Sequence, residues 1–171
     1  LTFQIVAPEV DERALPDEVP LAIATRLATA KAQRVAALYP DALIIGSDQV
    51  CALGDQVLGK PGSHANACAQ LRKLSGNQAT FFTALTVLNT ASGRLQQAHD
   101  ITQVRFRSLD DAQIERYLLR DKPYGSAGSA KAESLGIALV DAIKTEDPSA
   151  IIGLPLIKLV TLLNNEGVEV L

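Results

Sequence analysis

Residues 41–50 have the sequence Asp41-Ala42-Leu43-Ile44-Ile45-Gly46-Ser47-Asp48-Gln49-Val50. The four apolar residues 42–45 show no polar alternation, which predicts a strand that is buried on both faces and ends near Gly46. Asp48 would then lie just beyond a core strand, and in open α/β sheets ligands bind at this edge. Asp48 is therefore a candidate for chemistry, although an Asp in such a place also caps turns.

The composition restricts the class of protein. The chain has 171 residues, 47% of them hydrophobic and 20% charged, which predicts one compact domain over residues 1–171. No apolar run approaches the ~20 residues that a membrane span needs. The net charge of −3 and the scattered basic residues argue against a nucleic-acid partner, so we expect a small-molecule partner. A homodimer stays open.

The cysteines and histidines are few. Cys51 and Cys68 form no CxxC motif, and His64 and His99 lie far apart in the sequence. Neither a disulfide scaffold nor a zinc site is expected from these positions. The sparse cysteines, with no visible signal peptide, predict a cytoplasmic protein. The sequence lacks methionine and opens inside a strand-like stretch, so we expect a natural start further upstream.

The order of predicted elements indicates the fold class. The patterns predict strands over 1–6, 78–89, 94–107 and 137–143, helices over 20–39, 63–74, 109–119 and 154–163, and a hairpin formed by 50–53 and 57–58. Ser108 is the predicted N-cap of the third helix. This alternation predicts an α/β domain with a central mixed sheet flanked by helices.

Two groups of charged residues before the central strand are candidates for a site. Glu9, Asp11 and Glu12 place three carboxylates in four residues, which fits an exposed loop or a divalent-metal or catalytic site. Lys31 falls on the apolar stripe of the predicted helix, together with Leu27. Its amine must either extend to solvent or meet an anion at the edge of the core.

Two later segments have phosphate-binding character. In Gly59-Lys60-Pro61 a lysine is held between a flexible and a rigid residue, which suits a phosphate contact or a plain surface turn. The glycine- and serine-rich segment 124–136 could turn free N–H groups toward a phosphate or a base, or serve as a flexible linker.

Taken together, several motifs resemble those of one family in the right order along almost the whole chain. They are Pro8-Glu9-Val10-Asp11-Glu12, Ala30-Lys31-Ala32, Ile45-Gly46-Ser47-Asp48-Gln49-Val50, Gly59-Lys60-Pro61, Ala127-Gly128-Ser129-Ala130-Lys131-Ala132-Glu133 and Ile152-Gly153-Leu154-Pro155. The chain resembles the Maf family of nucleotide pyrophosphatases, also called septum formation inhibitors. The resemblance implies a fold like that of the inosine triphosphate pyrophosphatases.

The resemblance also implies an activity and roles. It implies hydrolysis of a nucleoside triphosphate to the monophosphate and pyrophosphate with a divalent cation, Mg²⁺, Mn²⁺ or Co²⁺. Asp48 is then the catalytic residue and, with Glu12, a metal ligand, while Lys31 and Lys60 bind phosphates.

Substrate choice is also implied by resemblance. Gln49 after the catalytic Asp resembles the 7-methyl-GTP branch, whereas Thr in that place marks the dTTP/UTP branch. Glu133 fits a guanine edge, since a carboxylate accepts from two N–H donors. Family members begin with a strand and a Ser-x-Ser-Pro-Arg-Arg loop that this sequence does not match. The competing function is a regulator of septum formation that binds a nucleotide without depending on turnover.

Overall fold

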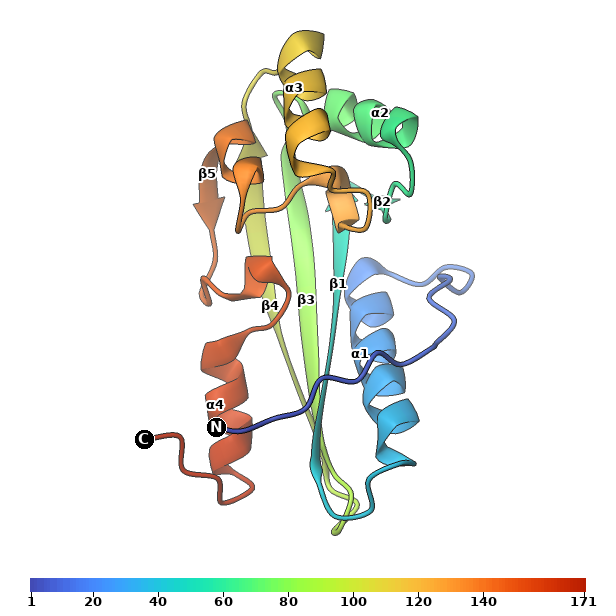
Figure 1. The fold of residues 1–171 in the computed structure, drawn as a ribbon, viewed down its shortest axis with the longest axis vertical. Helices are drawn as coiled ribbons and strands as arrows, with labels where there is room; N and C mark the ends of the chain where they lie inside the picture. Colours follow the sequence, from blue (N-terminus) through green and yellow to red (C-terminus); the bar gives the residue numbers. More distant parts are fainter. The chain divides into compact units, whose positions relative to one another are not determined.

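The structure is a computed structural model that describes residues 1–171. The chain forms two compact units, one made of residues 1–48, 83–100 and 147–171 and the other of residues 49–82 and 101–146. The helices are α1 (Pro20–Ala36), α2 (His64–Leu74), α3 (Asp111–Asp121) and α4 (Leu156–Asn164), and the strands are β1 (Leu43–Leu53), β2 (Gln56–Leu58), β3 (Gln78–Asn89), β4 (Leu95–Phe106) and β5 (Val140–Lys144). Figure 1 shows these elements. None of the helices has the length and apolar content that crossing a membrane requires.

The five strands form one sheet in the order β2-β1-β3-β4-β5. The predicted α/β class is confirmed, but the sheet is antiparallel, not mixed. β2 pairs antiparallel with β1 and β5 with β4. Thr90, just after β3, donates its N–H to the carbonyl of Ala42, just before β1. Phe106, the last residue of β4, donates its N–H to the carbonyl of Asn77, just before β3. In both pairs the end of one strand thus lies beside the start of its neighbour. The short turns between β1 and β2 and between β3 and β4 also require that each of these pairs runs in opposite directions.

Within the first unit, helices lie on both faces of the sheet. On β1, Gly46 approaches α1, while the next residue, Ser47, bonds the Gly153 carbonyl just before α4. Successive strand residues point to opposite faces, so α1 and α4 lie on opposite sides of the sheet. On the α4 side a core forms between β3 and the helix from Leu85, Val87, Leu159, Leu162 and Leu163.

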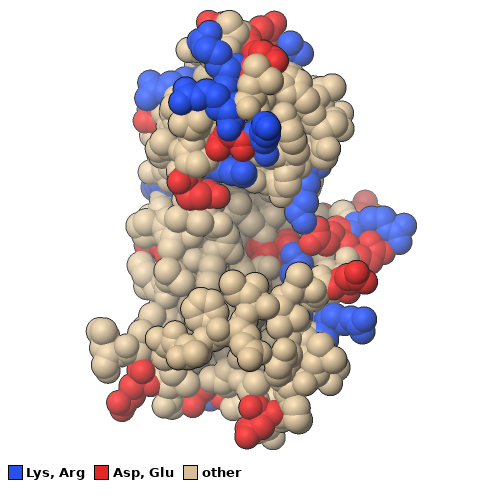
Figure 2. All heavy atoms as spheres, viewed as in Figure 1, with Lys and Arg blue, Asp and Glu red and all other residues tan.

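The outer face of α4 is apolar. Leu156 and Ile157 are half exposed, and Val160 follows on the same helix. In Figure 2 the region around α4 shows mostly uncharged atoms, whereas the loop before α1 carries interleaved acidic and basic side chains.

The second unit packs α2 and α3 together beside the ends of β1, β3 and β4. The predicted helix 63–74 is confirmed as α2, on which Ala67, Leu71 and Leu74 are buried, and Ser63 caps it by accepting from the N–H of Asn66. The hairpin between β1 and β2 is also confirmed. Arg72 of α2 pairs with Asp111 of α3 at 2.7 Å.

Several predictions of local structure were wrong, among them the start of the predicted strand 137–143, since residues 135–139 form a 3₁₀ turn and β5 begins at Val140. The predicted strand 1–6 is not formed, because Leu1, Phe3 and Ile5 are exposed and no strand pairs with them. The helix from Pro20 ends at Ala36, so Leu38 is exposed. The cap of α3 is Asp110, not Ser108, because Asp110 forms a reciprocal capping box with Gln113.

One buried carboxylate holds the start of α4. Asp147 is 1% exposed and accepts from the Ile157 N–H at 2.7 Å and from the Ser149 hydroxyl at 2.5 Å. Burial works against the charged form, yet these donors outweigh it and lower the pKa of Asp147. Because the folded pKa is depressed, this stabilisation is present above the unfolded pKa of about 3.9 and is lost as the pH falls through the folded pKa.

We predict that Asp147→Asn lowers the free energy of unfolding by about 1–3 kcal/mol at pH 7, since the amide loses the charge-assisted bonds to the N-terminus of α4. Urea unfolding measures the loss, and Glu169→Gln at an exposed position is the control. As the pH falls toward 3, the difference between wild type and Asp147→Asn should shrink. A constant difference over that range would contradict the role of the charge.

Candidate active site

The position of the site depends on a glycine in β1. A Cβ added to Gly46 of β1 would lie 2.3 Å from the Ala28 carbonyl oxygen and 2.9 Å from the Ala32 nitrogen, both in the backbone of α1. Only glycine permits this approach of a helix to a strand. Ala24, Ala28 and Ala32 are all fully buried on the same side of α1, so small residues line both sides of the contact.

This contact places Asp48 against α1. Asp48 is two residues after Gly46, so it points to the same face of β1. Lys31 is next to Ala32 on α1, and its ammonium donates to the Asp48 carboxylate at 2.5 Å. The same ammonium lies 3.0 Å from the carboxylate of Glu12. Asp48 therefore lies within β1, not beyond its end as the apolar pattern predicted, and Ile45 is 41% exposed instead of buried.

The structure resolves the alternatives for Lys31 in favour of an anion contact. Burial favours the neutral amine, but the hydrogen bonds and charges of Asp48 and Glu12 outweigh it, so the pKa of Lys31 is raised. The stabilisation from this pairing is fully present below the unfolded lysine pKa of about 10.4 and is lost only as the pH rises through the higher folded pKa. The ammonium is thus charged throughout the neutral range.

The loop that carries Glu12 is tied to α1 by residues that the sequence did not single out. The guanidinium of Arg26 donates to Glu18 at 2.6 and 2.7 Å and to the Arg13 carbonyl at 3.1 Å. Glu18 in turn accepts from the Leu15 N–H at 3.0 Å. The bonds to Arg26 and to the loop backbone hold the pKa of Glu18 at about 2. Arg26 therefore fixes residues 13–18 close to the helix, one residue away from Glu12.

The remaining predicted site residues belong to the second unit. Gln49 follows Asp48 on β1 and is half-buried, Lys60 is exposed in the loop after β2, and Glu133 is exposed between two short 3₁₀ turns. The loop around Lys60 is held by the Gly62 N–H, which donates to the Tyr124 carbonyl. The structure thus brings Glu12, Lys31 and Asp48 together in the first unit.

The glycine- and serine-rich segment 124–136 is ordered by specific contacts and is not a flexible linker. Ser129 is fully buried with a positive φ of 56°, and its hydroxyl donates to Gln70 of α2 at 2.6 Å. Gly128 also has a positive φ, and an added Cβ would lie 2.8 Å from the sulfur of Cys51. A side chain in that position is excluded by both conformation and space.

The cluster of Glu12, Lys31 and Asp48 suits metal-assisted phosphate chemistry. Two carboxylates from different segments converge on one positive charge, at 3.0 and 2.5 Å. Carboxylate oxygens are the donors that Mg²⁺ and Mn²⁺ prefer, so this donor set fits a divalent cation. In this structure the positive charge next to the two carboxylates is the ammonium of Lys31.

Comparison with known proteins gives one family. The family model described as Maf-like protein matches residues 1–166. The 7-methyl-GTP pyrophosphatase of Thiobacillus denitrificans is 52% identical over all 171 residues, which cover 85% of its own length. That of Nitrosococcus oceani is 48% identical over the whole chain and 86% of its length. That of Burkholderia pseudomallei is 50% identical over 168 residues, 96% of this chain and 78% of its own.

We predict that Gly46→Ala lowers the free energy of unfolding by about 1–3 kcal/mol, because the new methyl group meets helix backbone that must move. Displacing α1 also withdraws Lys31 from Asp48. Chemical denaturation measures the stability loss. The control is Gly125→Ala, where an added Cβ has no atom within 4 Å. Equal stability of the two variants would show that α1 does not need the glycine.

Proposed function

The chain belongs to the Maf family, and from this premise we propose that it hydrolyses 7-methyl-GTP to 7-methyl-GMP and pyrophosphate. The observation that carries the proposal is the identity of about half of all residues, over the whole chain, to relatives named 7-methyl-GTP pyrophosphatase. The convergence of Glu12, Lys31 and Asp48 supplies groups suited to that reaction.

We propose that Glu12 and Asp48 hold a divalent cation. When bound, the cation offsets the charge that develops on the phosphates as pyrophosphate leaves. The two carboxylates come from an exposed loop and a half-buried strand position. Glu12 can therefore adjust to the cation while Asp48 stays fixed by β1.

Asp48 orients the attacking water and takes its proton. The water oxygen attacks the α-phosphorus, the bond from that phosphorus to the oxygen bridging to the β-phosphorus breaks, and pyrophosphate takes the bonding electrons. Asp48 then returns the proton to solvent. The Lys31 ammonium at 2.5 Å weakens Asp48 as a base. We infer that Lys31 turns toward the incoming phosphates, which frees the carboxylate for the water.

Lys60 is proposed as a second cation for the phosphates. Its side chain is exposed at the end of the β1–β2 hairpin region, between Gly59 and the buried Pro61. A lysine contacts phosphate as a compact point charge without a fixed geometry, so an exposed loop position is sufficient for it. Neutralising several phosphate charges also helps pyrophosphate to leave.

The base is proposed to be selected by Glu133 and Gln49. 7-Methylguanine carries a delocalised positive charge, and its edge offers two N–H donors that a carboxylate such as Glu133 can accept. The chain has no Trp and only three Tyr and four Phe, so stacking on aromatic side chains contributes less than polar contacts. The amide of Gln49 can both donate and accept.

We predict that Asp48→Asn keeps the fold and lowers kcat for 7-methyl-GTP by about 10²–10⁴-fold, because the amide cannot take the proton of the water. Pyrophosphate release with Mg²⁺ or Mn²⁺ measures the rate, and thermal unfolding checks the fold. The control Asp41→Asn changes an exposed Asp just before the same strand. If the wild-type protein bound the nucleotide without releasing pyrophosphate, the regulatory function would replace the enzymatic one.

We predict that Gln49→Thr combined with Glu133→Gln lowers kcat/KM for 7-methyl-GTP more than for UTP or dTTP. The expected difference is about 1–3 kcal/mol, the contribution of one charged hydrogen-bonding pair. Parallel assays on the three nucleotides measure it. An equal fall for all three would mean that these residues shape the site without selecting the base, and higher activity of the wild type on UTP or dTTP would favour the other branch.

A further inference from the structure

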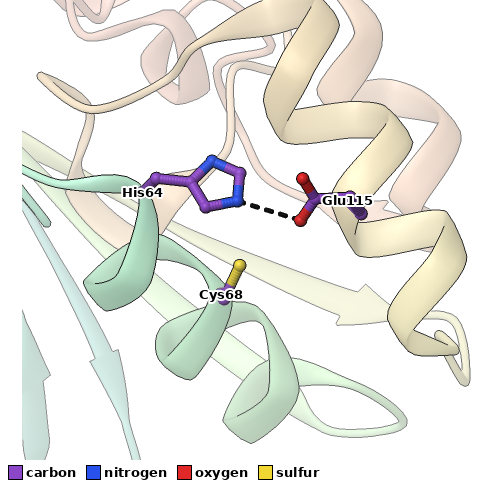
Figure 3. Close-up of side chains that lie close together, drawn as sticks. All are labelled: His64, Cys68 and Glu115. Atoms are coloured by element: carbon purple, nitrogen blue, oxygen red, sulfur yellow. Dashed lines mark hydrogen bonds and ion pairs between the residues drawn. The ribbon is translucent and has the colours of Figure 1, made fainter.

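A cluster of metal-ligand types lies in the second unit, among residues that the proposed function does not use. His64, Cys68 and Glu115 each offer one ligand atom, and these atoms all lie within 4.8 Å of one another. Figure 3 shows the three side chains pointing toward a common space between α2 and α3. His64 and Cys68 are half-buried and Glu115 is exposed.

The cluster follows from helix geometry and packing. His64 and Cys68 are four residues apart on α2, so they lie one above the other on one face of the helix. Glu115 comes from α3, which packs against α2, and an exposed ion pair of Arg72 and Asp111 at 2.7 Å also joins the two helices. The Nε2 of His64 lies 2.9 Å from a carboxylate oxygen of Glu115. Two ligands on one helix and one on a packed neighbour is a rigid arrangement.

The ligand set is that of zinc. Imidazole nitrogen, thiolate sulfur and carboxylate oxygen are its three usual protein ligands, with bond lengths of about 2.0–2.3 Å. In a tetrahedral site these lengths place the ligand atoms roughly 3.3–3.6 Å apart. The N–O distance of 2.9 Å must therefore widen slightly and the sulfur must approach, which small rotations of half-exposed side chains achieve.

Tyr124 adds an orienting contact to the histidine. Its hydroxyl lies 3.0 Å from the Nδ1 of His64 and 3.5 Å from the Leu118 carbonyl. If the ring proton is on Nδ1, it donates to Tyr124, whose own proton points to Leu118, and Nε2 is left with a lone pair for a metal. A hydrogen-bond partner on the second nitrogen is typical of metal-binding histidines.

We propose that His64, Cys68 and Glu115 bind one Zn²⁺, with water as the fourth ligand, and that the ion fastens α2 to α3. This site is independent of the proposed pyrophosphatase activity, since its residues lie outside the cluster of Glu12, Lys31 and Asp48. The two sites also differ in chemistry. A thiolate and an imidazole favour Zn²⁺ or Co²⁺, whereas two carboxylates favour Mg²⁺ and Mn²⁺.

The test uses Co²⁺ as a spectroscopic probe on the whole chain of residues 1–171 after chelator treatment. A cysteine ligand gives a thiolate-to-cobalt charge-transfer band in the near ultraviolet, which oxygen ligands do not give. We expect the band to saturate at one Co²⁺ per chain and to disappear when one equivalent of Zn²⁺ is added. Cys51 cannot cause it, because it is fully buried and burial raises the pKa of its thiol to about 12.

Three variants assign the ligands and two serve as controls. Cys68→Ser should abolish the band, and His64→Gln and Glu115→Gln should each weaken Zn²⁺ binding by roughly tenfold or more in a chelator competition. The matched control Asp111→Asn removes the same charge from α3 and breaks its ion pair with Arg72, but removes no ligand, so its affinity should equal that of the wild type. Asp48→Asn should leave the band unchanged.

Three outcomes would overturn the proposal. They are no thiolate band in the wild type, a band that persists in Cys68→Ser, or equal Zn²⁺ affinity of wild type, His64→Gln and Glu115→Gln. Zn²⁺ should also raise the Tm of the wild type and the Asp111→Asn variant but not that of Cys68→Ser. Failure of pyrophosphate release in any of these samples has no bearing on the result, because the readouts are binding and unfolding.

Discussion

The contact between α1 and β1 at Gly46 determines where the charged groups of the first unit can lie. The carbonyl of Ala28 leaves no room for a side chain there, so the helix backbone rests directly on the strand. Two residues further along β1 the same face carries Asp48, and the ammonium of Lys31 on α1 is within hydrogen-bond distance of it. The intervening Ser47 faces the other side, where its hydroxyl lies 2.6 Å from the Gly153 carbonyl. Three consecutive residues of β1 thus have three roles. Gly46 permits the approach of α1, Ser47 bonds to the loop before α4, and Asp48 places its carboxylate beside Lys31.

Much of the fold could be predicted from the sequence because local signals agree with the packing. α2 shows this well, since its Ser63 cap and its buried Leu71 follow from residue type and spacing alone. The strand β1 shows the limit. Its apolar run stops at Ile45, yet the strand continues to Leu53, because hydrogen bonding to neighbouring strands supports polar residues that periodicity assigns to a loop. Residues 1–6 show the converse, an alternating pattern that stays exposed without a pairing partner.

How far each candidate site could be predicted also depended on whether local sequence signals agree with the packing. The order of motifs along the chain pointed to the family, which the comparisons confirm, and the contact of Lys31 with an anion was one of two alternatives that the helix stripe left open. The role of Arg26 in holding the loop before α1 depends on a contact with Glu18 that no spacing rule signals. His64 and Cys68 supply only two ligands in sequence, and the third is 47 positions beyond Cys68, so zinc was not expected until the packing of α3 on α2 was known.

The charges around Lys31 also bear on the order in which the proposed triphosphate substrate and divalent cation would bind. Two carboxylates and one ammonium sum to −1, and a triphosphate carries about four negative charges. Like charges about 4 Å apart repel by roughly 4 kcal/mol near a protein surface, so this cluster alone disfavours the nucleotide. If Glu12 and Asp48 hold a divalent cation, as proposed above, the sum becomes +1 and the cation shares these oxygens with the ammonium. The ammonium of Lys31 would then be able to turn toward the phosphates, as the proposed mechanism requires. The pairing with Asp48 and Glu12 thus keeps Lys31 charged and holds its ammonium beside the two carboxylates that are proposed to bind the cation.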